Sequence, residues 1–84
     1  MTAHQLLVLR LLGDADGLLD THQLRLKMTI ASGGKTEWNY DRTHALLIRM
    51  QRAHLVSRHK PRNGNASRWG LTALGATHVE AELA

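Results

Sequence analysis

The stretch that decides the fold runs from residue 52 to residue 75 and reads RAHLVSRHKPRNGNASRWGLTALG. It holds two short strand-like segments, residues 55–59 and 67–71, on either side of a polar loop that contains Asn63-Gly64. Asn-Gly is the strongest short-range signal for a β-hairpin, because both residues tolerate the positive φ angles of a tight turn. The pattern therefore predicts two antiparallel strands joined by a loop over residues 60–65.

Three helical segments precede the hairpin. The first begins at Thr2 with Gln5 three residues later, and the second begins at Asp20 with Gln23 three residues later. Both pairs have the spacing of a capping box. The glycine at position 13 and the glycine pair at 33–34 end these helices, and Leu18-Leu19 between them predicts a very short strand.

The third helix is predicted to start between Thr36 and Asn39 and to end near Ala53. Its apolar residues recur at the spacing of a buried helix face. The residues of that face are Leu46, Leu47, Met50 and Ala53. The residues expected on the opposite side are Asp41, Arg42, Ala45, Arg49 and Arg52.

A last helix is predicted over residues 73–83, with Thr72 as its cap. Trp69 alternates with Leu71 on the preceding strand, which predicts that Trp69 lies in the core beneath the hairpin. The first helix is crowded with apolar residues between positions 6 and 12, too many for one narrow stripe. It is therefore expected to be buried on more than one side or to pack against a second subunit.

Positive charge is concentrated in the second half of the chain. The net charge is +4, and the stretch from Arg42 to Val79 contains no Asp or Glu. Its basic residues are Arg42, Arg49, Arg52, Arg58, Lys60, Arg62 and Arg68. The other residues carry four basic side chains against all seven acidic ones, so this stretch accounts for the whole excess. A one-sided basic segment indicates an acidic polymer, such as a nucleic acid, as the partner.

The order helix, helix, helix, hairpin, helix is that of a winged helix-turn-helix domain. The segments THALLIRMQRAHLVSR (43–58) and RWGLTALGATHVE (68–80) resemble MarR- and PadR-like transcriptional regulators, in which aromatic-x-Leu-Thr-x-x-Gly recurs. Here Trp69, Leu71, Thr72 and Gly75 match that motif, whereas His54 stands where those families usually carry glycine. The resemblance covers roughly residues 18–80 and implies a mainly α, DNA-binding fold with a small β-hairpin. The chain length of 84 residues predicts a single domain over residues 1–84.

In such a domain the N-terminal half of the third helix reads base edges in the major groove. The contacts predicted on and just before this helix are Lys35, Asn39, Tyr40, Arg42, Thr43, His44 and Arg49. Arg42 is expected to bond guanine, and Asn39 either contacts DNA or only caps the helix. Tyr40 reads DNA or packs in the core, and one of Thr43 and His44 must face the core by helical periodicity.

The hairpin is expected to grip the phosphate backbone. Its predicted contacts are Arg58, Lys60, Arg62, Asn63 and Arg68. For the other tryptophan, Trp38, packing against the second helix is favoured over stacking on a sugar.

Catalysis and metal binding find no support in the sequence. The chain has no cysteine, and its six histidines form no helical ligand pair, so no cofactor or metal is expected. It has no apolar run long enough for a membrane span and no secretory signal, and a cytoplasmic, nucleoid-associated protein is expected.

The sequence thus predicts a sequence-specific binder of double-stranded DNA that is not an enzyme. A homodimer acting on an inverted repeat, and repressing by occluding a promoter, is the simplest form of such a regulator. The alternative is a winged-helix module that binds an acidic protein partner, and RNA binding is a weaker option because no exposed aromatic platform is visible.

Overall fold

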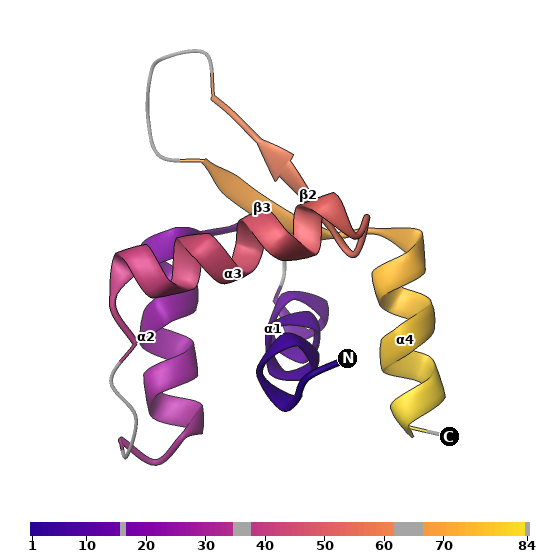
Figure 1. Ribbon diagram of the computed structural model, residues 1–84, viewed down its shortest axis with the longest axis horizontal. Coiled ribbons are helices and arrows are strands. Elements are labelled where there is room, and N and C mark those ends of the chain that lie inside the picture. Colours follow the sequence, from indigo (N-terminus) through magenta and orange to yellow (C-terminus); the bar gives the residue numbers. More distant parts are fainter. Residues whose placement is uncertain (16, 35–37, 62–66, 84) are drawn as a thin grey trace.

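The computed structural model describes residues 1–15, 17–34, 38–61 and 67–83. Within this part of the chain the elements follow in the order α1 (Ala3–Asp14), β1 (Leu19–Asp20), α2 (Thr21–Ala31), α3 (Tyr40–Arg52), β2 (Val56–His59), β3 (Arg68–Leu71) and α4 (Ala73–Leu83). In Figure 1, α3 runs across the view above α1, with α2 at its left end and α4 to the right, and the hairpin of β2 and β3 rises above α3. The predicted mainly α, winged-helix arrangement is confirmed.

The sheet has three antiparallel strands in the order β1-β3-β2. Leu19 of β1 pairs with Trp69 of β3, and Trp69 in turn pairs with Arg58 of β2. The predicted short strand before α2 therefore exists, displaced by one residue, and it covers the edge of β3 that the hairpin alone would leave open. The predicted turn at residues 63–64 lies outside the described residues.

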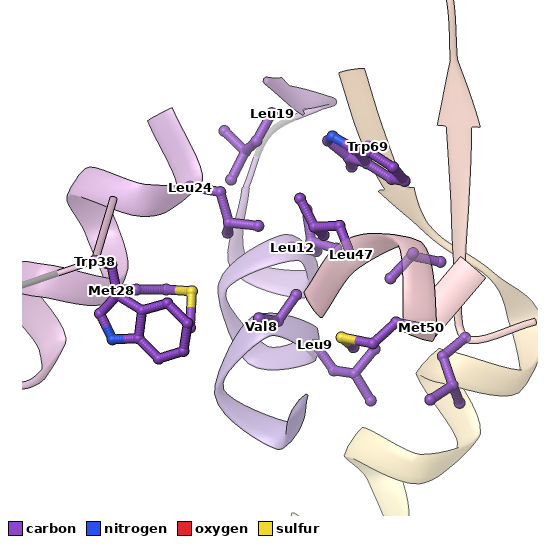
Figure 2. Packing of buried hydrophobic residues seen from close by; sticks show 12 residues of the cluster. Val8, Leu9, Leu12, Leu19, Leu24, Met28, Trp38, Leu47, Met50 and Trp69 are labelled. Atoms are coloured by element: carbon purple, nitrogen blue, oxygen red, sulfur yellow. The ribbon is translucent and has the colours of Figure 1, made fainter. Parts of the chain in front are cut away.

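All of the first three helices contribute to one core beneath the sheet (Figure 2). The buried apolar residues are Val8, Leu9, Leu12, Leu19, Leu24, Met28, Trp38, Leu47, Met50, Leu55, Val56 and Trp69. Leu7 and Leu11 of α1 pack half-buried against this cluster, as does Val79 of α4. The expectation that α1 is buried on more than one side is confirmed, because it lies between α2 and α4 (Figure 1).

Side-chain caps set where the first two helices begin. The Thr2 hydroxyl accepts a hydrogen bond from the Gln5 backbone N–H at 3.2 Å, and the Gln5 side chain accepts one from the Thr2 backbone at 3.0 Å. Asp20 and Gln23 form the same reciprocal pair at the start of α2, at 2.7 and 3.0 Å. Both predicted capping boxes are confirmed, and they satisfy N–H groups that a helix start leaves without an intrahelical partner.

The buried face of α3 differs from the predicted one at two positions. Leu47 and Met50 are buried as expected, but Leu46 is only half-buried and Ala53 is exposed. Ala53 is the C-cap, where the chain turns away from the core. Thr43 takes the remaining buried position, four residues before Leu47, and is fully buried.

The end of α3 requires a left-handed residue, and His54 supplies it with φ of 62°. The Leu55 N–H donates to the Met50 carbonyl and the His54 N–H donates to the Gln51 carbonyl, which together form a Schellman motif. The departure from glycine at position 54 therefore leaves the turn intact but places a residue with a Cβ in a conformation that disfavours it.

We expect His54→Gly to raise the free energy of unfolding by about 0.5–1 kcal/mol, because relief of the left-handed strain exceeds the added flexibility of glycine in the unfolded chain. His54 is exposed, so its side chain loses little packing. The control His54→Ala keeps the Cβ and is expected to change stability by less than about 0.5 kcal/mol. Urea unfolding of the three proteins measures the difference, and equal midpoints for all three would contradict it.

The Leu-Thr-x-x-Gly motif holds α4 against the turn that follows α3. The Thr72 hydroxyl accepts a hydrogen bond from the Gly75 N–H at 3.0 Å and lies 2.7 Å from the His54 carbonyl oxygen and 2.9 Å from that of Leu55, either of which can accept its proton. A Cβ on Gly75 would meet the Leu55 carbonyl oxygen and lie 2.9 Å from Leu71 Cδ1. Only glycine lets the first turn of α4 approach this closely.

Gly75→Ala is expected to lower the free energy of unfolding by about 1–3 kcal/mol, although alanine favours a helix, because the new methyl group meets a backbone carbonyl that cannot rotate away. Gly13→Ala is the matched control: it also lies in a helix, and its Cβ would meet Leu71 Cδ2 at an ordinary 3.7 Å. That control is expected to be neutral or stabilising. Thermal unfolding compares the two variants. A higher unfolding temperature for Gly75→Ala than for Gly13→Ala would contradict the close approach of α4 to the Leu55 carbonyl.

Candidate nucleic-acid interface

A run of ring contacts joins the first turns of α3 to the hairpin. Tyr40 stacks on His44 with the ring centroids 5.8 Å apart, and His44 meets Trp69 of β3 edge-to-face at 5.9 Å. At the Trp69 end of this run, the guanidinium of Arg58 lies 5.4 Å from the Trp69 ring centroid. These contacts place strand β2, which carries Arg58, beside the N-terminal half of α3.

Trp69 anchors this run of ring contacts in the core. It is fully buried, and its indole N–H donates a 2.9 Å hydrogen bond to the Thr21 hydroxyl at the start of α2. The predicted core position of Trp69 is confirmed. Because a buried indole N–H needs an acceptor, this bond also holds the ring in one orientation.

The structure settles which of Thr43 and His44 faces the core. Thr43 is fully buried and its hydroxyl donates to the Asn39 carbonyl at 2.9 Å, so the prediction that Thr43 contacts DNA is wrong: it has no exposed surface to offer a base. His44 is half-buried between Tyr40 and Trp69. Its Nδ1 is buried without a hydrogen-bond partner among the described atoms.

Asn39 and Tyr40 are both at the surface. The Asn39 side-chain oxygen accepts a 2.8 Å hydrogen bond from the Arg42 backbone N–H, so Asn39 is the N-cap of α3. Its amide nitrogen is the group that remains for a DNA contact. Tyr40 is 45% exposed and is therefore not a core aromatic residue.

Arg42 stacks on Trp38. Its guanidinium carbon lies 4.0 Å from the centre of the Trp38 ring, and His4 of α1 packs edge-to-face on that tryptophan at 4.9 Å. Trp38 is only 3% exposed, which confirms packing over sugar stacking. Its backbone N–H donates to the Thr29 hydroxyl at 3.2 Å and its carbonyl accepts from Arg25 at 3.3 Å. This stacking holds the Arg42 side chain on the flank of α3 that faces α1.

A hollow of about 360 Å³ lies between the start of α1 and that flank of α3. It is lined by Thr2, His4, Gln5, Trp38, Arg42, Ala45, Leu46 and Arg49. None of the described lining residues is acidic. The helical repeat did place Arg42 and Arg49 on one face, but nothing in the sequence indicated that residues 2–5 lie beside them.

The hairpin cations are distributed over both faces of the sheet. Arg58 lies on the face of Trp69 and α3, and its Nε donates to the Ser67 hydroxyl at 2.9 Å. Arg68 precedes Trp69 by one residue, so its side chain lies on the opposite face, where it is exposed and pairs in register with Asp20 of β1. Lys60 directly follows β2 and is exposed. The predicted contacts Lys35, Arg62 and Asn63 lie outside the described residues.

Other kinds of site find little support in the described part of the chain. No three His, Asp or Glu side chains come close enough there to hold a metal ion. Among the same residues, no helix has the length and apolar character of a membrane span.

The fold is that of winged-helix transcription regulators. Two structures of H. salinarum RosR superpose with TM-scores of 0.84 and 0.83 at 22% and 21% identity, over 99% of this chain and 70% and 71% of theirs. A MarR family protein from Bacillus stearothermophilus superposes with a TM-score of 0.77 at 26% identity, over 96% of this chain and 50% of that one.

A third neighbour was solved bound to DNA. Bacillus subtilis PadR in complex with operator DNA has a TM-score of 0.78 at 14% identity, over 98% of this chain and 47% of its own. This chain thus spans about half the length of the MarR family protein and of PadR. No protein-family model and no curated sequence matches it. These neighbours are transcription regulators and not enzymes, in agreement with the prediction.

Asn39→Ala is expected to lower the free energy of unfolding by about 1 kcal/mol, because the Arg42 N–H loses its capping acceptor. Asn39→Ser keeps an acceptor of similar capping strength and is expected to stay within a few tenths of a kcal/mol of wild type. Chemical unfolding distinguishes the two. Since Asn39→Ser removes the amide without unfolding the helix start, any loss of DNA affinity in that variant belongs to a contact made by the amide nitrogen.

Proposed function

We propose that this chain is a sequence-specific DNA-binding transcriptional regulator. The observation that carries the proposal is the ring contact of His44 with Trp69, which brings the cationic strand β2 beside the first turns of α3. Cations such as Arg58 supply sequence-independent affinity for the DNA backbone, and a helix that enters the major groove reads the bases. The similarity to PadR, solved with operator DNA, supports the same assignment.

In this proposal α3 enters the major groove and the hairpin lies along the flanking backbone. Tyr40 and the amide of Asn39 stand at the exposed N-terminal end of α3, which is the end that contacts bases in helix-turn-helix proteins. Arg58 and Lys60 extend the cationic surface along the hairpin. His44 serves this surface by supporting Tyr40 rather than by contacting DNA.

The proposal includes a homodimer built through α1 and α4. Leu74 of α4 is 46% exposed, and Leu6 and Leu11 of α1 are half-buried, so an apolar surface remains on these helices. Two-fold symmetry would place two α3 helices about one turn of DNA apart, on an inverted repeat. The regulator would act as one domain over residues 1–84 in the cytoplasm, on the nucleoid, and repress by occluding a promoter.

A second candidate is a protein-interaction module. It is favoured by one observation on α2, where Leu26 and Ile30, four residues apart, are 43% and 76% exposed. Two large apolar side chains on one exposed helix face fit a protein partner. Both side chains belong to α2 and not to α3 or the hairpin, so separate substitutions test the two functions.

Selection of bound sequences from a random duplex pool, followed by a salt titration of the best sequence, tests the proposal. We expect an enriched inverted repeat and an affinity that falls linearly in the logarithm of salt concentration, with a slope of about −0.9 for each phosphate contacted. Salt-sensitive binding without an enriched motif would contradict sequence specificity. No binding at low salt would reject the regulator and favour the module.

A further inference from the structure

The two flanks of α3 face different neighbours. Successive helical residues turn by about 100°, so Arg42 and His44 lie about 200° apart around the axis, on opposite flanks. His44 meets the sheet at Trp69, whereas Arg42 and Arg49, seven residues apart, both line the hollow beside the start of α1. The N terminus and the hairpin accordingly lie on opposite sides of α3 (Figure 1).

The hollow is organised for an anion. Two guanidinium groups line it, and the one on Arg42 is held by its stacking on the buried ring of Trp38 at 4.0 Å. The capping box uses the oxygen of each of the Thr2 and Gln5 side chains as an acceptor. The Thr2 hydroxyl proton and the Gln5 amide N–H groups remain as donors. Two cations, one of them held by stacking, together with free donors and no acidic group among the described lining residues, match an oxyanion.

A helix in the major groove has one phosphate backbone on each side of it, because the groove is about 12 Å wide and bounded by both strands. If the hairpin contacts one backbone, the hollow faces the other. We infer that this hollow binds a DNA backbone phosphate on the strand opposite the hairpin, with Arg42 and Arg49 as its ligands. The inference rests on the proposed function. It also makes Arg42 a phosphate contact, in place of the guanine contact expected from sequence.

The test compares Arg49→Ala with two controls on the selected duplex. Arg10→Ala removes an exposed arginine of α1 outside the hollow, and Lys60→Ala removes a cation of the hairpin. Arg49→Ala is expected to lower the salt slope by about 0.9 and to weaken binding equally on matched and mismatched sequences, whereas Arg10→Ala changes neither. An unchanged salt slope for Arg49→Ala would overturn the inference.

Replacing single phosphates by uncharged methylphosphonates, one position at a time on both strands, locates the contact. Wild type is expected to lose affinity at a position on the strand opposite the hairpin. Arg49→Ala should lose less than wild type at that position, because only Arg42 still contacts the phosphate there, while Lys60→Ala should still lose the full amount. If all three proteins respond alike at every position, the hollow does not bind phosphate, although DNA binding itself stands. If wild type binds no duplex, both the proposed function and this inference are rejected.

Discussion

The arrangement of this small domain depends on one buried tryptophan. Trp69 occupies the central strand, and its indole N–H is satisfied by the Thr21 hydroxyl at the first residue of α2. Its ring contacts both His44 of α3 and Arg58 of β2. An unpaired N–H in this position would cost about 1–3 kcal/mol, so the hydrogen bond fixes the sheet relative to the helices. Because Trp69 lies on β3, its position also sets the position of the hairpin formed by β2 and β3.

A second tryptophan, Trp38, positions an arginine on the other flank of α3. Trp38 is hydrogen-bonded to α2 through the Thr29 hydroxyl and Arg25, and the guanidinium of Arg42 stacks on its ring. Each flank thus has a buried aromatic ring with an arginine stacked on it, Arg58 at 5.4 Å and Arg42 at 4.0 Å. Such stacking restricts the side chains before any ligand binds, which lowers the entropy lost on binding.

Features that depend on neighbouring residues were predictable from the sequence. The capping boxes at Thr2 and Asp20, the strand before α2 and the cap at Thr72 all follow from spacings of a few residues. The buried face of α3 was harder to predict from the sequence. Ala53 continues the apolar period but leaves the core because the chain turns at His54, and Thr43 enters the core because its hydroxyl finds the Asn39 carbonyl.

The sequence by itself determined the order of elements, the hairpin, and the concentration of positive charge after Arg42, because these are set by local spacing and composition. Only the tertiary structure decided which cations act together. Strand alternation separates Arg68 from Arg58, and helix packing brings His4 of the first helix beside Arg42 of the third. Contacts between residues so far apart in the chain depend on how whole elements pack, which no spacing within one element records.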